Sequence, residues 1–377
     1  MATSAYDAIV IGLGVMGAAA CRSLAQRGLH VLGLEQFQIG HDQGSSHGRT
    51  RVIRKAYFEA PGYVPLAHQA FDAWRELERH SGQTLLRVTG CLNIGPADHE
   101  CIRGVIRSTR EHSLPCEQLD AHEIAHRWPA LHPAANDIGV FEPDAGVLFA
   151  EPCVQALAQD ACSHGVTLRC DEKIEQWEVS AGDVVVLSKD AEYRAKHLVL
   201  CAGPWLSTLS GDIGEPLSIE RQVQAWFDPV EPPLCEVGLL PVFIHFTPQG
   251  DFYGMPNLDG QGVKAARHHG GIVTTPDTVS RVVSPQDEQE IRGYLVRHLP
   301  AANGALRDAK ICLYTNSPDS HFIIDRHPAH TNVWIAGGFS GHGFKFAPVV
   351  GEALANLVAG ESGRPELAMF RLSRFAD

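Results

Sequence analysis

The stretch DAIVIGLGVMGAAACRSLAQRGLHVLGLE, residues 7–35, holds the signals that decide the fold. Residues 7–12 form a β-branched run, which is typical of a buried parallel strand. Residues 18–28 predict a helix with Gly28 just past its end, and residues 30–35 predict a second strand that ends in an acid. The order of strand, glycine turn, helix, strand and acid predicts a dinucleotide-binding unit.

The glycines of this turn follow the pattern Gly-x-Gly-x-x-Gly. Gly12 permits the tight turn, Gly14 lets a pyrophosphate approach the backbone, and Gly17 lets the helix pack closely. The N–H groups at the start of the helix then face the phosphate. Glu35 is placed to bind ribose hydroxyls, which disfavours the 2′-phosphate of NADP. The unit alone does not separate NAD from FAD.

The composition bounds the possible partners. The chain has 377 residues, long enough for two domains, and a formal net charge of −13, which argues against nucleic-acid binding. No apolar run reaches the ~18 residues of a membrane span, and the first segment lacks the basic region of a signal peptide. The ten cysteines form no C-x-x-C pair, so we expect no disulfide framework and no metal site. We therefore expect a cytoplasmic protein with mostly reduced, buried thiols.

A basic cluster follows in GSSHGRTRVIRKAYFEAPGYVPL, residues 44–66. One interpretation is a solvated charge run, and the other is the lining of an anion site. The pattern G-S-x-H-G-x-T-R-x-I-R-x-A-Y, followed by Y-V-P-L, resembles the flavin-binding loop of the monomeric sarcosine oxidase and N-methyltryptophan oxidase family. The resemblance implies that His47 and Arg51 lie beside the isoalloxazine ring of FAD. It also implies that Arg54 binds a substrate carboxylate, to which a bidentate guanidinium is well suited.

The loop departs from the family at two positions. Arg49 stands where the family usually has Asp, and Lys55 stands where it often has His. Both positions neighbour matched residues, so the local charge and the loop details of the family do not carry over.

Three residues of the middle segment form the next candidate set: Tyr253, Lys264 and His268. On a strand, Lys264 and His268 share one face. Read alone, Lys264 is an ordinary surface lysine and His268 a hydrogen-bonded polar residue. The family has the same three residues at the same spacing. The resemblance implies that Lys264 stands over the flavin N5 edge and promotes oxygen reduction, while Tyr253 and His268 line the substrate side.

Cys312 lies in ICLYTNSPDSHFIIDRHP, residues 311–328, which resembles the family's C-x-Y-x-x-x-P-D-x-x-F-I-I-D stretch. The resemblance implies that Cys312 forms a covalent thioether to the flavin 8α-methyl group. A basic neighbour such as Arg51 would favour the thiolate that this reaction needs. We interpret the other nine cysteines as inert buried groups.

Near the end of the chain, GGFSGHGFKFAPVVGEAL, residues 337–354, predicts a glycine turn and a helix from about residue 346 to Gly360. A helix N-terminus would stabilise negative charge on reduced flavin. The resemblance places Gly341, Gly343 and Phe344 against the cofactor. It implies that Lys345 binds the substrate carboxylate together with Arg54. A merely solvated lysine is a poor alternative, because a cation is unfavourable at that end of the helix dipole.

We therefore predict an α/β flavoprotein of two discontinuous domains. Residues 1–82, 146–216 and 320–377 form a Rossmann-like FAD domain, and residues 83–145 and 217–319 form a substrate domain on an antiparallel sheet. The resemblance implies a monomeric oxidase of a secondary amino acid such as sarcosine or N-methyltryptophan, with O₂ as acceptor and H₂O₂ as product. Alternatives stay open: pipecolate, proline or sugar-modified amino acids as substrate, a dehydrogenase with a protein acceptor, an NAD enzyme, or a non-catalytic nucleotide-binding protein.

Overall fold

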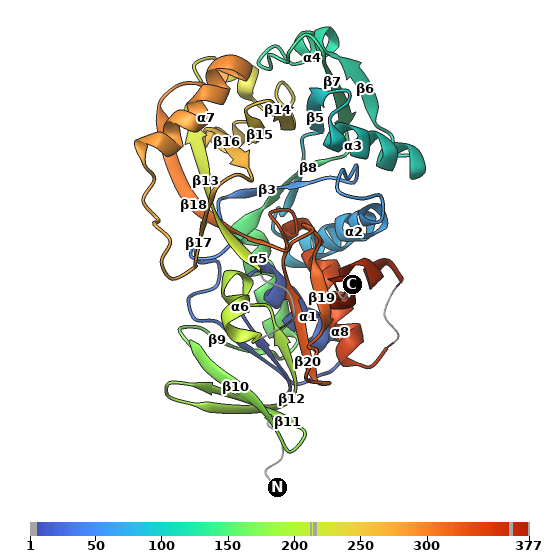
Figure 1. The fold of residues 1–377 in the computed structure, drawn as a ribbon, viewed down its shortest axis with the longest axis vertical. Helices are drawn as coiled ribbons and strands as arrows, with labels where there is room; N and C mark the ends of the chain where they lie inside the picture. Colours follow the sequence, from blue (N-terminus) through green and yellow to red (C-terminus); the bar gives the residue numbers. More distant parts are fainter. Residues whose placement is uncertain (1–5, 212, 214–216, 362–364, 376–377) are drawn as a thin grey trace.

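Two large β-sheets and one small one organise the described part of the chain (Figure 1). The structure is a computed structural model that describes residues 6–211, 213, 217–361 and 365–375. Each large sheet draws its strands from distant segments of the chain.

The first sheet has eight strands among the described residues and contains the dinucleotide unit. Its parallel centre runs in the order β9 (Thr167–Arg169), β2 (Val31–Leu34), β1 (Tyr6–Ile11), β12 (Glu192–Leu200) and β20 (Val333–Gly337). Antiparallel strands flank it: β10 (Ile174–Ser180), β11 (Asp183–Ser188) and β19 (Ile323–Arg326). Helix α1 (Val15–Gln26) packs between α5 (Ala150–Ser163) and α8 (Ala347–Val358). The apolar strands β1 and β2 are mostly buried, as expected for the centre of a parallel sheet.

The second sheet has nine strands in the described chain, and all but one of its pairings are antiparallel. Its order is β17 (Ile272–Thr274), β13 (Ser218–Phe227), β16 (Val263–His268), β15 (Gly250–Met255), β14 (Val242–Thr247), β5 (Cys91–Pro96), β7 (Asp137–Glu142) and β6 (Glu117–Asp120), with β18 (Leu306–Asn316) paired to β13. Three helices accompany it: α3 (Glu100–Glu111), α4 (Ala121–Arg127) and α7 (Pro285–His298). Capping boxes fix the starts of α4 and α7.

A small sheet lies between the two large ones (Figure 1). It consists of β3 (Thr50–Ile53), β8 (Gly146–Phe149) and β4 (Leu86–Val88). The remaining helices are α2 (Tyr63–Ser81) and α6 (Leu206–Leu209), and a 3₁₀ turn, η5 (Phe344–Phe346), leads into α8. Because β3 and η5 approach from opposite ends of the chain, they bring the basic loop to the C-terminal glycine turn.

The predicted fold class is confirmed: a parallel sheet with a dinucleotide turn is joined to a second, mostly antiparallel sheet. The predicted first and last helices also form, with α1 ending at Gln26 and α8 beginning at Ala347. The division into two domains at residues 82, 145, 216 and 319 stays a prediction. None of the described helices is both long and apolar enough to cross a membrane, and no described group of acids, histidines and cysteines could hold a metal.

Candidate active site

One continuous cavity runs from the dinucleotide turn to the second sheet. Its lining includes residues of both large sheets and of the basic loop: Gly12, Gly14, Glu35, Ser45, Arg51, Arg54, Glu59, Gln224, Tyr253, His268, Cys312, Tyr314, Gly341, His342, Gly343, Phe344 and Lys345. The cavity therefore collects, from segments far apart in the sequence, most of the candidate residues predicted above.

The dinucleotide end of the cavity is set by backbone contact. Gly12 has a φ of +89°, in the left-handed region. A Cβ on Gly17 would stand 1.7 Å from the Gly12 carbonyl oxygen, so the first turn of α1 can pack here only with glycine. Glu35 accepts hydrogen bonds from the N–H groups of Leu13 (2.7 Å) and Phe37 (3.1 Å). A carboxylate has about four lone-pair sites, so Glu35 keeps capacity for ribose hydroxyls.

Cys312 and Arg51 meet in the middle of the cavity. The Arg51 guanidinium lies 3.6 Å from the Cys312 sulfur, and it also donates to the carbonyls of Ser45 and Thr50 at 2.7 and 2.9 Å. It stands over the Phe344 ring at 5.7 Å. The guanidinium is thus held in place beside the Cys312 sulfur by two backbone carbonyl groups.

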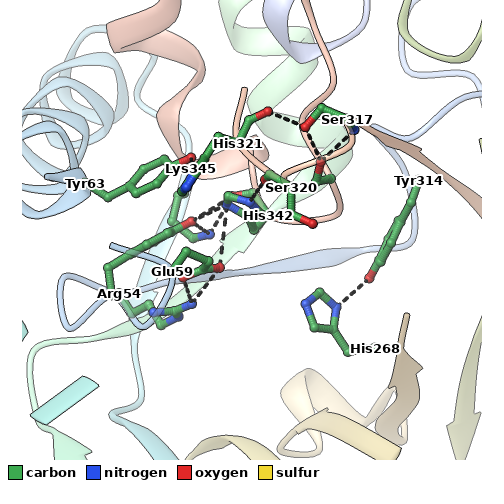
Figure 2. Close-up of polar contacts among 12 residues, drawn as sticks. Arg54, Glu59, Tyr63, His268, Tyr314, Ser317, Ser320, His321, His342 and Lys345 are labelled. Carbon is green, nitrogen blue, oxygen red and sulfur yellow. Dashed lines mark hydrogen bonds and ion pairs between the residues drawn. The ribbon is translucent and has the colours of Figure 1, made fainter. Parts of the chain in front are cut away.

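Arg54 lies in the deeper part of the cavity and is paired within the chain. Its Nη2 donates to both carboxylate oxygens of Glu59, at 3.3 and 3.1 Å, and its Nη1 donates to the Ala56 carbonyl at 2.6 Å (Figure 2). Burial disfavours the charged form, but the Glu59 carboxylate, Tyr57 and Cys91 together raise the pKa of Arg54. The guanidinium lies over the rings of Tyr57 and Phe58, 4.2 Å from each centroid.

Lys345 lies beside this pair and is 5% exposed. Its ammonium donates to the Tyr57 hydroxyl (3.2 Å) and to the His342 carbonyl (2.7 Å). Burial and the nearby Arg54 cation lower the pKa of Lys345 to about 7. Its charge therefore depends on which anion enters the cavity.

The opposite wall comes from β15, β16 and β18. His268 Nδ1 lies 3.2 Å from the Tyr314 hydroxyl (Figure 2). The Tyr253 ring meets the His268 ring edge-on, with 6.2 Å between the ring centroids. Burial lowers the pKa of His268 well below its ordinary value and raises the pKa of Tyr253 to about 12. This wall is therefore uncharged at neutral pH.

A family model described as FAD dependent oxidoreductase matches residues 7–357. The chain belongs to the FAD dependent oxidoreductase family. Monomeric sarcosine oxidase of Streptomyces avermitilis is 41% identical over 379 residues, 98% of each chain. N-methyl-L-tryptophan oxidase of Salmonella enteritidis is 36% identical over 374 residues, 98% of this chain and 99% of that protein. The family resemblance read from the sequence is thus confirmed, and this FAD-dependent oxidoreductase is an enzyme.

Solved structures show the same fold at low sequence identity. The open form of NikD, an unusual amino acid oxidase essential for nikkomycin biosynthesis, has a TM-score of 0.86, 24% identity and 98% coverage of both chains. L-proline dehydrogenase from P. horikoshii has a TM-score of 0.85 and 21% identity, covering 100% of this chain and 99% of that one. At these identities the likeness supports the fold of the FAD-dependent oxidoreductase, not its substrate.

The cavity of this FAD-dependent oxidoreductase fits its cofactor. Two buried polar atoms of the lining, Gln224 Oε1 and Thr315 Oγ1, have no hydrogen-bond partner among the described residues, which indicates a polar ligand beside them. The glycine turn suits a pyrophosphate and Glu35 suits ribose hydroxyls. The chemistry of the donor set therefore agrees with FAD along the whole cavity.

Three predicted site residues, Gly17, Lys264 and His47, are buried but do not belong to the cavity lining. Lys264 is 2% exposed, and its ammonium donates to the carbonyls of Gly48 and Thr50 at 2.8 and 3.0 Å. Both ring nitrogens of His47 lack a hydrogen-bond partner in the part of the chain that the structure describes, and burial together with Arg51 lowers the pKa of His47 to about 3. Their predicted roles toward flavin and oxygen stay predictions.

Arg49 and Lys55, the two residues that depart from the family loop, form ion pairs outside the cavity. Arg49 forms an ion pair with Asp308 at 2.6 Å and stacks over Trp226 at 4.5 Å. The Lys55 ammonium lies 3.9 Å from Asp144. The altered charges are thus largely compensated locally.

Three functional groups were missed in the sequence: Tyr57, Glu59 and His342. Tyr57 and His342 lie inside matched motifs, but neither stood out from its neighbours. Glu59 stands five positions after Arg54, a separation at which an acid can pair with a cation in a loop, and that spacing is the one signal that could have found it.

Proposed function

We propose that the enzyme oxidises a secondary, N-methyl amino acid such as sarcosine or N-methyltryptophan, giving an imine and H₂O₂. The imine hydrolyses to formaldehyde and the amino acid when the substrate is N-methylated. The observation that carries the proposal is the buried pair of cations, Arg54 and Lys345. Both stand over the Tyr57 ring, at 4.2 and 5.1 Å, and both line the cavity.

Arg54 and Lys345 bind the substrate carboxylate in this proposal. Two cations in a water-poor cavity hold one carboxylate far more tightly than they would in water. Glu59 neutralises Arg54 in the free protein, so the substrate carboxylate competes with Glu59 for the guanidinium. Phe58, Ile244 and Met255 provide apolar wall beside Tyr253 and fit the carbon skeleton of an amino acid.

When bound, FAD would supply the two-electron acceptor for oxidation of the C–N bond, with O₂ as the final acceptor. The chain holds the cofactor through the Gly12 turn, Glu35, the Gly341–Gly343 turn and the Cys312 thiol, which we propose is joined covalently to the flavin. The proximity of Arg51 to the Cys312 sulfur supports this tether. The uncharged His268 and Tyr253 wall orients the amine without pairing with it.

Acid precipitation of the purified protein tests the tether. The pellet should stay yellow, and in Cys312→Ser the flavin should move to the supernatant. Cys162→Ser, which changes an exposed thiol, should behave as the unaltered protein. Flavin that washes out of the unaltered protein overturns the tether.

A panel of secondary amino acids, each matched to its decarboxylated amine, tests the reaction. Peroxide should form from the amino acids and not from the matched amines. Oxidation with dye reduction but without peroxide would instead indicate a dehydrogenase, and no bleaching with any amine would contradict the proposal.

A further inference from the structure

A chain of hydrogen bonds leads from Lys345 to the protein surface on the side away from the wall formed by Tyr253 and His268. The Lys345 ammonium donates to the Tyr57 hydroxyl at 3.2 Å, and this hydroxyl lies 2.9 Å from His342 Nδ1. His342 Nε2 lies 3.0 Å from the Ser320 carbonyl oxygen (Figure 2). Tyr57 is fully buried, whereas Ser320 is exposed.

The partners fix the direction of each hydrogen bond. A carbonyl oxygen can only accept, so His342 Nε2 carries the hydrogen that it donates to Ser320. His342 Nδ1 is then the unprotonated nitrogen of the neutral ring, and it accepts from the Tyr57 hydroxyl. The Tyr57 oxygen in turn accepts from Lys345. All three hydrogen bonds therefore point outward, from the buried amine to the surface.

We propose that Tyr57 and His342 carry a proton from Lys345 to solvent at Ser320 once in each turnover. The proton on Nζ passes to the Tyr57 oxygen while the Tyr57 hydroxyl proton passes to His342 Nδ1. The Nε2 proton then leaves to a surface water, which gives Lys345–NH₂ and H₃O⁺. A tautomer exchange through surface water, which moves the proton from Nδ1 back to Nε2, restores the ring without returning a proton to Lys345.

The transfer serves the proposed reaction, on which this inference rests. An amino acid arrives with a protonated amine, but oxidation needs the free amine. The uncharged Lys345 amine accepts that proton: R₂NH₂⁺ and Lys345–NH₂ become R₂NH and Lys345–NH₃⁺. The substrate carboxylate stabilises the new ammonium, and the path through Tyr57 discharges it when the product leaves.

The electrostatics around the path agree with this cycle. A pKa of about 7 leaves a large uncharged fraction of Lys345 at neutral pH, and burial lowers the pKa of His342 to about 4, so the imidazolium is only transient. Glu59 Oε1, 3.6 Å from His342 Nδ1, offsets its charge. The charged and titratable groups that interact with Lys345 and His342, besides each other, include Arg51, Arg54, Glu59, Cys91 and His268.

Acetate binding to the FAD-loaded protein tests the path without turnover, because acetate offers a carboxylate and no amine. Acetate should shift the flavin absorbance, and a pH-indicator dye should report proton uptake as Lys345 becomes charged. By microscopic reversibility, proton release on dilution follows the outward path. In Tyr57→Phe we expect proton release to slow at least about tenfold while the flavin signal persists.

Two further variants distinguish a loss of proton transfer from a structural disturbance of the cavity. His342→Ala should show the same slowing, and added imidazole should restore the rate. Tyr63→Phe is the matched control, because Tyr63 stacks on Tyr57 at 4.7 Å and bonds His321 at 3.0 Å but makes no hydrogen bond to Lys345 (Figure 2). It should release protons at the original rate.

Different results would contradict the proton path and the proposed function. Proton release at the original rate in Tyr57→Phe, or His342→Ala that imidazole does not rescue, overturns the path. An acetate site that is absent from the unaltered protein overturns the proposed function instead, since the carboxylate would then bind elsewhere.

Discussion

The two ends of the cavity are built by different physics. At the dinucleotide end, Gly12 and Gly17 are held by backbone contact, and almost nothing but glycine fits. At the carboxylate end, Arg54, Glu59 and Lys345 are held by charge, and their states change with the ligand. Steric contact therefore sets the dinucleotide end, and electrostatic interactions set the carboxylate end. We expect a substitution at the dinucleotide end to cause a large loss of stability, and a substitution at the carboxylate end to cause a smaller, graded change in stability or ligand affinity.

The largest effect on stability is expected at the dinucleotide end of the cavity. Gly17→Ala places a methyl group 1.7 Å from the Gly12 carbonyl oxygen, so α1 must move away from the turn. We expect a loss of about 4 kcal/mol or more in the free energy of unfolding, together with loss of FAD. The flavin-to-protein ratio and denaturant unfolding measure both. Gly293→Ala, with its nearest neighbour at 3.6 Å in α7, should instead add about 0.5–1 kcal/mol. If the two variants changed the free energy of unfolding and the flavin content equally, steric contact at Gly17 would not be what shapes the dinucleotide end.

Removing one partner of the buried ion pair comes next. Arg54→Met leaves the Glu59 carboxylate buried without its cation, which we expect to cost about 3–5 kcal/mol of stability. The double variant Arg54→Met with Glu59→Gln should regain most of that loss, as urea unfolding would show. A double variant as unstable as the single one would mean that packing over Tyr57 and Phe58, not charge, holds Arg54 in place.

The pH dependence of acetate binding tests whether charge controls the carboxylate end of the cavity. Acetate favours the charged form of Lys345, and the free protein loses that proton as the pH rises through about 7. The dissociation constant should therefore be flat below this pH and rise above it by up to about tenfold per pH unit. A spectral titration across pH 5–9 measures it. Lys345→Met should bind weakly with no such rise, and a rise that survives in this variant would assign the titration to another group.

The smallest effect is expected at Glu59. Glu59→Gln weakens the internal competitor for Arg54, and the net contribution of one hydrogen bond is about 1 kcal/mol, or ~5-fold in affinity. At pH 6, where Lys345 is mostly charged, acetate should bind more tightly by that factor in calorimetry. Weaker binding would show that Glu59 orients Arg54 for the ligand and does not compete with it.

The same contrast explains what the sequence revealed. The strand, turn and helix of residues 7–35 are a local pattern, because the apolar residues and the glycines that predict them all lie within one short stretch, even though Gly12 also packs against the backbone of Cys201. Arg51 and Cys312 were brought together by resemblance, and the structure places them 3.6 Å apart. Tyr57 and His342 are 285 positions apart and leave no periodic signal, so the proton path could not be read. The sequence spacing alone also could not predict that Lys264 and His47 are buried outside the cavity lining.

The order of strands in the first sheet has a consequence for synthesis. Strands β1 and β2 leave the ribosome early, but β12, which lies beside β1, ends at Leu200, and β20 and α8 come from the last fifth of the chain. A nascent chain thus carries its glycine turn for a long time without the neighbours that shape it. Contacts at such large sequence separation slow folding, so flavin capture is expected to be a late, post-translational event, and growth with scarce riboflavin should leave apoprotein rather than truncated chains.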